Sequence, residues 1–344
     1  MKNYKKAFLG SVVATVLSSS GVMAQDVTLR FSHYLPPQHA LPSNGFKNWM
    51  ESISEDSNES INFQVFPSQQ LGSATDHYDM VAMGIADVAW INSGYTAGRF
   101  PIADALQLPF LVNNNTKDAA VAATEWYRNY AHSEMSEVIM CVMHGHYPGT
   151  LHSKEEIRSP DQISGMTIRP AGSSIAQLVS ALGGASVQVP PPEAREALAR
   201  GTADAITFPY NSARLFGIDQ IVSYSIDYPI YSSWQAIVIN KASYEEMSDD
   251  QKEVIDSHCT GEWARKVTEY WDDWEREGYE ELKNSSNHVL VKLSESEENN
   301  WIEASKPLYD QWENKVNNAG YDAIELMDDL RRRLVEVDAL LIDE

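Results

Sequence analysis

The chain has 344 residues, of which 49 are acidic and 26 are basic, so its formal net charge is −23 at pH 7. A surface this acidic repels nucleic acid and anionic lipid, and we expect neither as a partner. The length is sufficient for two lobes that each bury a core. An anionic ligand needs a local cation in order to bind against this overall charge.

Residues 1–24 have the pattern of a secretory signal peptide. Lys2, Lys5 and Lys6 form a positive start, Ala7–Leu17 is an apolar stretch, and residues 22–24 read Val-Met-Ala, a small-x-small cleavage site. The apolar stretch is too short for a membrane span, although an uncleaved anchor is the alternative. We therefore predict export, with the mature protein in the periplasm.

Strands and helices alternate in the first part of the mature chain. Val27–Ser32 and Ile61–Phe66 are predicted strands, and Asn44–Ile53 between them is a predicted helix. Val138–His144 is a further predicted strand. Strands that alternate with helices are typical of a parallel sheet.

A six-residue pattern, Ala-x-Gly-x-Ala-Asp, occurs twice, at Ala82–Asp87 and at Ala199–Asp204. Each copy follows a helix-like segment and precedes a strand-like one, and its glycine is a suitable helix stop. The two copies indicate two similar α/β lobes that face each other across a cleft. The strand ends Trp90–Asn92 and Phe208–Asn211 are then expected at the rim of the cleft, where open α/β sheets place ligands.

The second half of the chain carries a returning strand and a long helical pattern. Ser233–Asn240 is predicted to return to the first lobe. Ser248–Lys283 begins with a capping box and continues as an amphipathic pattern of about thirty-five residues. At ~1.5 Å per residue such a helix reaches ~50 Å, which is enough to brace both lobes. Glu297–Leu341 is predicted to be more amphipathic helix.

These elements divide the mature chain into two discontinuous lobes. The first is predicted to comprise residues 26–146 and 236–285, and the second residues 147–235 and 286–344. The chain has two cysteines, Cys141 and Cys259. In an oxidising compartment they either form a disulfide or remain free, and the sequence leaves both outcomes open. Two thiols are too few for a structural zinc site.

Five segments occur in an order and spacing that match a known family. They are Val65–Gly72, Gly84–Asp87, Ser164–Pro170, Gly201–Asp204 and the stretch before the long helix. The mature chain resembles the periplasmic solute-binding proteins of tripartite ATP-independent (TRAP) transporters, the DctP type. The resemblance implies an α/β, two-lobe periplasmic binding protein fold (type II-like), with a hinge and a long helix that spans both lobes. It also implies a small organic acid as ligand and a TRAP membrane permease as partner. We expect a monomer without catalytic activity, cofactor or metal.

Arg169 is the main candidate for the ligand contact. It matches the arginine at the end of the family's G-x-K-I-R strand. A guanidinium group presents a planar fork that binds a carboxylate through two parallel hydrogen bonds. The alternative is an ordinary ion pair with a surface Asp or Glu.

The chain departs from the family's sugar-acid binders at two polar positions. Gly149 stands roughly where they carry a second arginine, and Phe208 stands roughly where they carry an asparagine. We therefore predict a monocarboxylate ligand with an apolar or aromatic body, rather than a dicarboxylate or sialic acid. The other candidate ligand-binding residues are aromatic or polar side chains at or near strand ends, with a place in the core as the alternative for each aromatic: His33, Tyr34, Trp90, Asn92, His146, Phe208, Tyr210, Asn211 and Trp234.

Two other functions remain open alongside solute transport. A periplasmic metal-binding or chaperone protein could use His33, His144 and His146, and a sensor could bind the same ligand but dock to a receptor. An enzyme is disfavoured because the sequence has no Gly-x-Ser-x-Gly elbow, His-Glu-x-x-His pair, phosphate loop or dinucleotide fingerprint.

Overall fold

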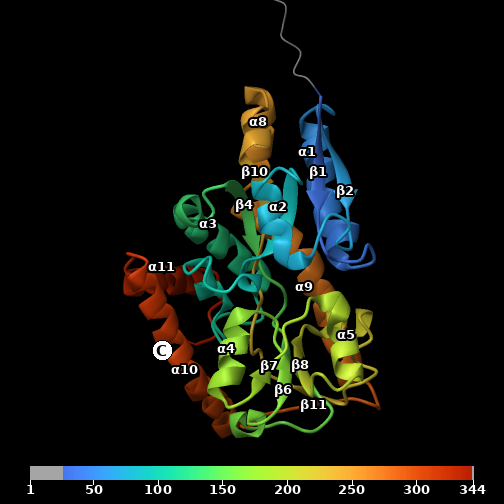
Figure 1. Ribbon diagram of the computed structural model, residues 1–344, viewed down its shortest axis with the longest axis vertical. Coiled ribbons are helices and arrows are strands. Elements are labelled where there is room, and N and C mark those ends of the chain that lie inside the picture. The colour runs from blue at the N-terminus through green and yellow to red at the C-terminus, as the bar shows by residue number, and fades with distance from the viewer. Residues whose placement is uncertain (1–25, 343–344) are drawn as a thin grey trace, which may run out of the picture.

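The computed structural model describes residues 26–342, which form two β-sheets surrounded by helices (Figure 1). The predicted signal peptide lies outside these residues. None of the helices in the described range is both long and apolar enough to cross a bilayer. The α/β fold with two lobes predicted from the alternating elements is confirmed.

The first sheet has five strands, in the order β2-β1-β3-β10-β4. β1 pairs in parallel with β2 and β3, whereas β10 is antiparallel to both β3 and β4. The strand predicted to return to the first lobe is therefore β10. The strands are β1 (Val27–Ser32), β2 (Ile61–Phe66), β3 (Val88–Asn92), β4 (Val138–His144) and β10 (Gln235–Asn240). The associated helices are η1 (Leu41–Gly45), α1 (Phe46–Asp56), η2 (Ala74–Asp76), α2 (His77–Ala82), η3 (Ser93–Tyr95), η4 (Ala103–Gln107), α3 (Thr116–Glu134), α7 (Lys241–Glu245) and α8 (Asp249–His258).

The second sheet has six short strands, in the order β11-β9-β5-β8-β6-β7. β6 is parallel to its neighbours β7 and β8, and β5 is antiparallel to β8 and β9. The strands are β5 (Thr150–Ser153), β6 (Thr167–Arg169), β7 (Ala185–Ser186), β8 (Ala205–Phe208), β9 (Tyr224–Ile226) and β11 (Val289–Val291). The helices between them are η5 (Pro160–Ile163), α4 (Ser173–Ala181), α5 (Pro191–Ala199) and α6 (Tyr210–Leu215).

Two segments without helix or strand, residues 145–149 and 227–234, each connect a strand of one sheet directly to a strand of the other. The segments lie side by side, because Gly149 and Tyr231 form an isolated antiparallel bridge. The Gly149 amide donates to the Tyr231 carbonyl at 2.8 Å, and the Ile230 amide donates to the Gly149 carbonyl at 3.2 Å. We call these two segments the crossings.

The prediction of one continuous helix over Ser248–Lys283 is wrong, because the pattern is divided between α8 and α9 (Gly261–Lys283). The Thr260 side chain accepts from the Trp263 amide and caps α9, which makes a new helix start inside the pattern. Cys259 lies at the break and forms a disulfide with Cys141 on β4, which settles the pairing that the sequence left open. α9 still spans both lobes, since it packs against α3 beside the first sheet and against α6 beside the second.

The C-terminal helices differ from the predicted division of the lobes. α10 (Glu295–Asn318) begins beside the second sheet, where Trp301 joins that core, and extends back so that Trp312 joins the core of the first sheet. α11 (Ala323–Glu336) then packs against α3 (Figure 1). Residues 286–344 were assigned as a block to the second lobe, but α10 is long enough, at ~1.5 Å per residue, to carry the chain back to the first.

Candidate ligand-binding site

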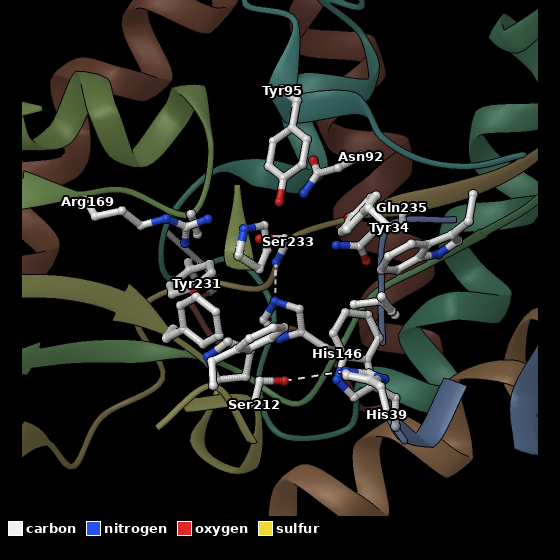
Figure 2. Close-up of a pocket in the computed structure, with 18 residues that line it drawn as sticks. Tyr34, His39, Asn92, Tyr95, His146, Arg169, Ser212, Tyr231, Ser233 and Gln235 are labelled. Atoms are coloured by element: carbon white, nitrogen blue, oxygen red, sulfur yellow. Dashed lines mark hydrogen bonds between the residues drawn. The ribbon is translucent and has the colours of Figure 1, made fainter. Parts of the chain in front are cut away.

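A cavity lies between the two sheets (Figure 2). Its walls come from strand ends of both sheets, from both crossings and from α9. The lining residues are Tyr34, Leu35, His39, Trp90, Asn92, Tyr95, His146, Arg169, Ala171, Pro191, Phe208, Pro209, Ser212, Phe216, Tyr231, Ser233, Gln235 and Trp271.

The structure brings six of the ten residues selected from the sequence to this cavity. These are Tyr34, Trp90, Asn92, His146, Arg169 and Phe208. Both copies of the repeated motif thus contribute an aromatic side chain, Trp90 from β3 and Phe208 from β8. The repeated motif predicts that the ends of these two strands lie at one cleft. In the structure, Trp90 and Phe208 line the same cavity.

The other four selected residues do not line the cavity. His33 packs against aromatic rings of the first core, and Trp234 is fully buried in that core. Tyr210 packs beside Tyr147 and α9, and Asn211 donates its side-chain amide to a backbone carbonyl of α9. In each case a neighbour in the chain faces the cavity instead, because neighbouring side chains in extended segments and at helix starts point in different directions.

Arg169 ends β6 and is 2% exposed. Its Nε donates to the Val189 carbonyl at 3.0 Å and its Nη1 to the Thr207 carbonyl at 3.3 Å, while Nη2 has no hydrogen bond of normal geometry. The guanidinium carbon lies 5.1 Å from the centre of the Phe208 ring. Among residues 26–342 its hydrogen bonds thus go to carbonyl groups and none goes to a carboxylate. A buried cation without an anion is costly, and an anionic group in the cavity relieves that cost.

Three polar side chains of the first lobe, Tyr34, Tyr95 and Asn92, interact with one another, and the Arg169 charge acts on both tyrosines. Burial raises the pKa of Tyr34 and of Tyr95, so both keep their hydroxyl protons, although the Arg169 charge acts in the opposite direction. The Asn92 side-chain oxygen accepts from the Gly94 amide at 2.9 Å, which leaves its Nδ2 as a donor. We call Arg169, Tyr34, Tyr95 and Asn92 the donor end of the cavity.

The opposite side of the cavity carries two neutral histidines. The His39 Nδ1 accepts from the Leu41 amide at 3.2 Å, so its proton is assigned to Nε2, which lies 3.5 Å from the Ser212 hydroxyl. The His146 Nε2 accepts from the Ser233 amide at 3.0 Å, so its proton is on Nδ1. Burial lowers the pKa of His39 to about 3 and of His146 to about 4, and neither ring is charged at neutral pH.

A buried carboxyl group lies directly behind Ser212. Glu275 of α9 accepts from the Asn211 amide at 2.6 Å, from the Ser212 amide at 3.1 Å and from the Trp271 Nε1 at 2.9 Å, and it also accepts from the Ser212 hydroxyl. Burial raises its pKa to about 7. Glu275 thereby caps α6 and joins it to α9. We call His39, His146, Ser212 and Glu275 the neutral end.

Several lining residues were missed in the sequence. Ser233 and Gln235 flank Trp234, so alternation along the predicted strand was the signal that could have found them, whereas Ser212 lies in α6 next to Asn211. Tyr95, His39 and Tyr231 come from segments without a periodic pattern, and no signal in the sequence singles them out. Four of the lining residues are aromatic and were not named among the candidates: Tyr95, Phe216, Tyr231 and Trp271.

Two of the three histidines considered for metal binding, His144 and His146, are hydrogen-bonded within the protein. The His144 Nε2 accepts from the Trp90 Nε1 at 2.8 Å, and both ring nitrogens of His146 have partners. Over residues 26–342, no three or more His, Cys, Asp or Glu side chains are grouped so that they could hold a metal ion.

The model of the bacterial extracellular solute-binding protein family 7, DctP, matches residues 31–315. The fold is similar to a TRAP solute-binding protein from Rhodoferax ferrireducens in complex with copurified benzoate, with a TM-score of 0.85 and 24% identity over 91% of this chain and 98% of that one. A TRAP solute-binding protein from a marine metagenome, specific for aromatic acid ligands and crystallised with 3-hydroxybenzoate, has a TM-score of 0.84 and 26% identity over 91% and 99% of the two chains.

A third similar structure is a TRAP periplasmic solute-binding protein from Bordetella bronchiseptica with bound (R)- and (S)-mandelate, with a TM-score of 0.84 and 24% identity over 91% and 100% of the two chains. TRAP solute-binding proteins are periplasmic receptors that bind small organic acids and work with membrane permease components. The family match covers most of the described residues and agrees with the resemblance noted in the sequence. The chain belongs to the bacterial extracellular solute-binding protein family 7, the DctP family, and is a TRAP-type periplasmic solute-binding protein.

Proposed function

We propose that this protein is the receptor for an aromatic monocarboxylate, which it delivers to a TRAP permease. The observation that carries the proposal is the contrast across the cavity between a buried cation without an anion, Arg169, and an opposite side that holds no cation. Support also comes from the three similar structures, whose ligands are benzoate, 3-hydroxybenzoate and mandelate.

The carboxylate of the ligand binds at the donor end. Arg169 supplies the charge, and the hydroxyls of Tyr34 and Tyr95 supply further donors. Charge-assisted hydrogen bonds of this kind are about twice as strong as neutral ones. The overall negative charge of the chain makes this local cation necessary for anion binding.

The body of the ligand occupies the space between aromatic side chains from both lobes. Trp90 and Tyr34 come from the first lobe and stand 4.6 Å apart between ring centres, and Phe208 comes from the second lobe. Aromatic rings favour a flat apolar ligand through offset or edge-to-face contacts. A sugar acid has hydroxyl groups on most of its carbons, and few of them find partners against these rings.

The neutral end disfavours a second negative charge. His39 and His146 are uncharged there, and the Glu275 carboxyl lies behind Ser212. The second carboxylate of a dicarboxylate is therefore desolvated without a cation and close to a group that carries negative charge when ionised. A hydroxyl or a hydrogen atom at the end of the ligand that faces the neutral end avoids the free-energy cost of desolvating an unpaired charge.

The lobes separate to admit the ligand and close over it. The lining side chains come from both lobes, and Tyr34, Trp90 and Arg169 are each almost fully buried, so the ligand has no open path to them in this arrangement. A ligand that bridges the lobes favours the closed form. Closure around a small acid is the step that presents the loaded receptor to the permease.

A thermal-shift panel tests the proposed ligand class. Benzoate, 3-hydroxybenzoate and mandelate are compared with succinate, malate and sialic acid, and benzamide serves as the uncharged match for benzoate. We expect an aromatic monocarboxylate to raise the melting temperature most, since a ligand at about 100 times its Kd adds ~2.7 kcal/mol to the stability. The proposed ligand class is overturned if a C4-dicarboxylate produces the largest shift, or if benzamide equals benzoate.

A further inference from the structure

Tyr231 lies in the second crossing, at the point where the chain pairs with Gly149 of the first. Its side chain lines the cavity and is 3% exposed. The hydroxyl oxygen is buried and makes no hydrogen bond of normal geometry within the described part of the chain. Buried hydroxyl groups are nearly always hydrogen-bonded, so this one requires an explanation.

Gly149 makes room for the Tyr231 ring. A Cβ atom at position 149 would lie 2.6 Å from both Cζ and Oη of Tyr231, a distance that two such atoms do not adopt. The end of the tyrosine ring therefore lies directly over the glycine backbone. Any residue with a Cβ atom at position 149 would displace the Tyr231 ring from this position.

Because the Tyr231 ring lies over the Gly149 backbone, its hydroxyl end is directed toward Arg169. In the second sheet β5, which begins next to Gly149, lies between β9 and β8, and β6 with Arg169 follows β8. The tyrosine side chain crosses the start of β5 and comes close enough for the Arg169 charge to lower its pKa, against the larger effect of burial, which raises it. Figure 2 shows the two side chains on the same side of the cavity.

Two buried groups on the same side of the cavity, the Arg169 Nη2 and the Tyr231 hydroxyl, thus lack a hydrogen bond of normal geometry within the described residues (Figure 2). Both belong to residues that line the same cavity. A single unsatisfied donor can result from local packing. Two donors that face the same cavity indicate instead that a hydrogen-bond acceptor of the ligand binds between them. A carboxylate has two oxygens and can accept from both donors at once.

We propose that the Tyr231 hydroxyl is a second contact to the ligand carboxylate, beside Arg169, and that Gly149 is the residue that allows it to be there. The inference rests on the proposed function and names a residue that determines specificity. A phenol is a neutral donor, so the pair provides two hydrogen-bonding groups but only one positive charge. The site is thereby matched to one carboxylate.

Calorimetry with benzoate as the probe tests the role of Tyr231. Tyr231→Phe removes only the hydroxyl, and we expect it to weaken benzoate binding roughly 10- to 100-fold, as for other hydrogen bonds to a charged group. Tyr228→Phe is the matched control, because Tyr228 lies three residues earlier, does not line the cavity and packs against Phe110. The control should bind benzoate as the wild type does, and both ligand-free variants should melt as cooperatively as the wild type.

The role of Gly149 is tested by a double-mutant cycle. Gly149→Ala should weaken benzoate binding at least as much as Tyr231→Phe, because the added methyl group displaces the ring. In a Tyr231→Ala background the methyl group meets no ring, and Gly149→Ala should then change the affinity less than about two-fold. Equal effects of Gly149→Ala in both backgrounds would overturn this part of the proposal.

The outcomes separate this inference from the proposed function. If the wild type binds benzoate and Tyr231→Phe binds it within two-fold, the tyrosine contact is refuted and the receptor function stands. If the wild type binds none of benzoate, 3-hydroxybenzoate and mandelate, the proposed function is refuted, and the tyrosine contact with it.

Discussion

The two ends of the cavity differ in how their polar groups are satisfied. Within residues 26–342, neither the Arg169 Nη2 at the donor end nor the hydroxyl of Tyr231 has a hydrogen bond of normal geometry. At the neutral end, both ring nitrogens of His146 have partners within the protein, and the Glu275 carboxyl accepts from backbone amides, an indole and a hydroxyl. Donors without a partner are expected to bind the carboxylate of the ligand. Groups whose hydrogen bonds are all made within the protein are expected to stabilise the fold.

The two ends are also built from different elements. The donor end consists of strand ends and the first residues after them, which come from both sheets. The neutral end is tied to α9 through Glu275, which joins that helix to the start of α6. The donor end should therefore govern affinity, and the neutral end should govern stability. Three measurements test this contrast.

The largest effect is expected from acid, and two of the five histidines that produce it lie at the neutral end. The pKa of His39 is lowered to about 3 and that of His146 to about 4, below the value of about 6.5 in the unfolded chain, so the stability that they contribute is complete above pH 6.5 and is lost as the pH falls toward 4. Burial also lowers the pKa of three histidines elsewhere to about 3 or 4: His33, His144 and His152.

Glu275 acts in the opposite direction, because its raised pKa of about 7 means that its contribution is complete below about pH 4.5 and is lost as the pH rises to 7. Asp104 and Asp272, with pKa values of about 7 and 6, have the same sign as Glu275. The five histidines have the larger combined shift, so the melting temperature should rise between pH 4 and 6.5. Scanning calorimetry at half-unit steps checks this, and a flat or falling melting temperature would contradict it.

The second effect concerns affinity at the donor end. Arg169→Ala should weaken binding of the monocarboxylate by ~2–5 kcal/mol, or roughly 30-fold to several thousand-fold, because the carboxylate loses its only charged partner in the cavity. Arg158→Ala is the control, since Arg158 is exposed and pairs with Glu156 and Glu297 away from the cavity. Calorimetry that finds equal affinity in Arg169→Ala and the wild type would remove Arg169 from the site.

The smallest effect concerns the packing of α9 on α6 behind the neutral end. A Cβ atom at Gly278 would lie 2.4 Å from the backbone of Asn211, so Gly278→Ala should push α6 away from Glu275 and lower the free energy of unfolding by ~1–3 kcal/mol. Glu277→Ala, at an exposed position of the same helix, should leave the stability within about 0.5 kcal/mol. Urea unfolding measures both variants. Equal stability of the two would show that the contact adjusts without cost.

The sequence predicts the donor end better than the neutral end. Arg169 is predicted from its match to the family's strand, and Trp90, Asn92 and Phe208 are predicted because the repeated motif marks where one strand of each lobe ends. The difference at neighbouring positions follows from side-chain direction. Trp234 was selected, but the flanking Ser233 and Gln235 line the cavity, because successive side chains in a strand face opposite ways.

Of the neutral end, only His146 is predicted from the sequence, because the residues of this end come from distant parts of the chain and are brought together only by the fold. His39, Ser212 and Glu275 are far apart along the chain, and none belongs to a motif. A buried Glu looks like any other acidic residue on an amphipathic helix until its partners are known. The break between α8 and α9 was in principle visible, since Thr260 followed by Gly261 is a plausible helix start inside the long pattern.

The disulfide between Cys141 and Cys259 anchors the start of α9 to β4 of the first sheet. The helix then packs along α3, and its later part packs on α6 beside the second sheet. At ~1.5 Å per residue, the 23 residues of α9 extend ~34 Å from this anchor. The covalent bond therefore fixes one end of an element that connects the two lobes.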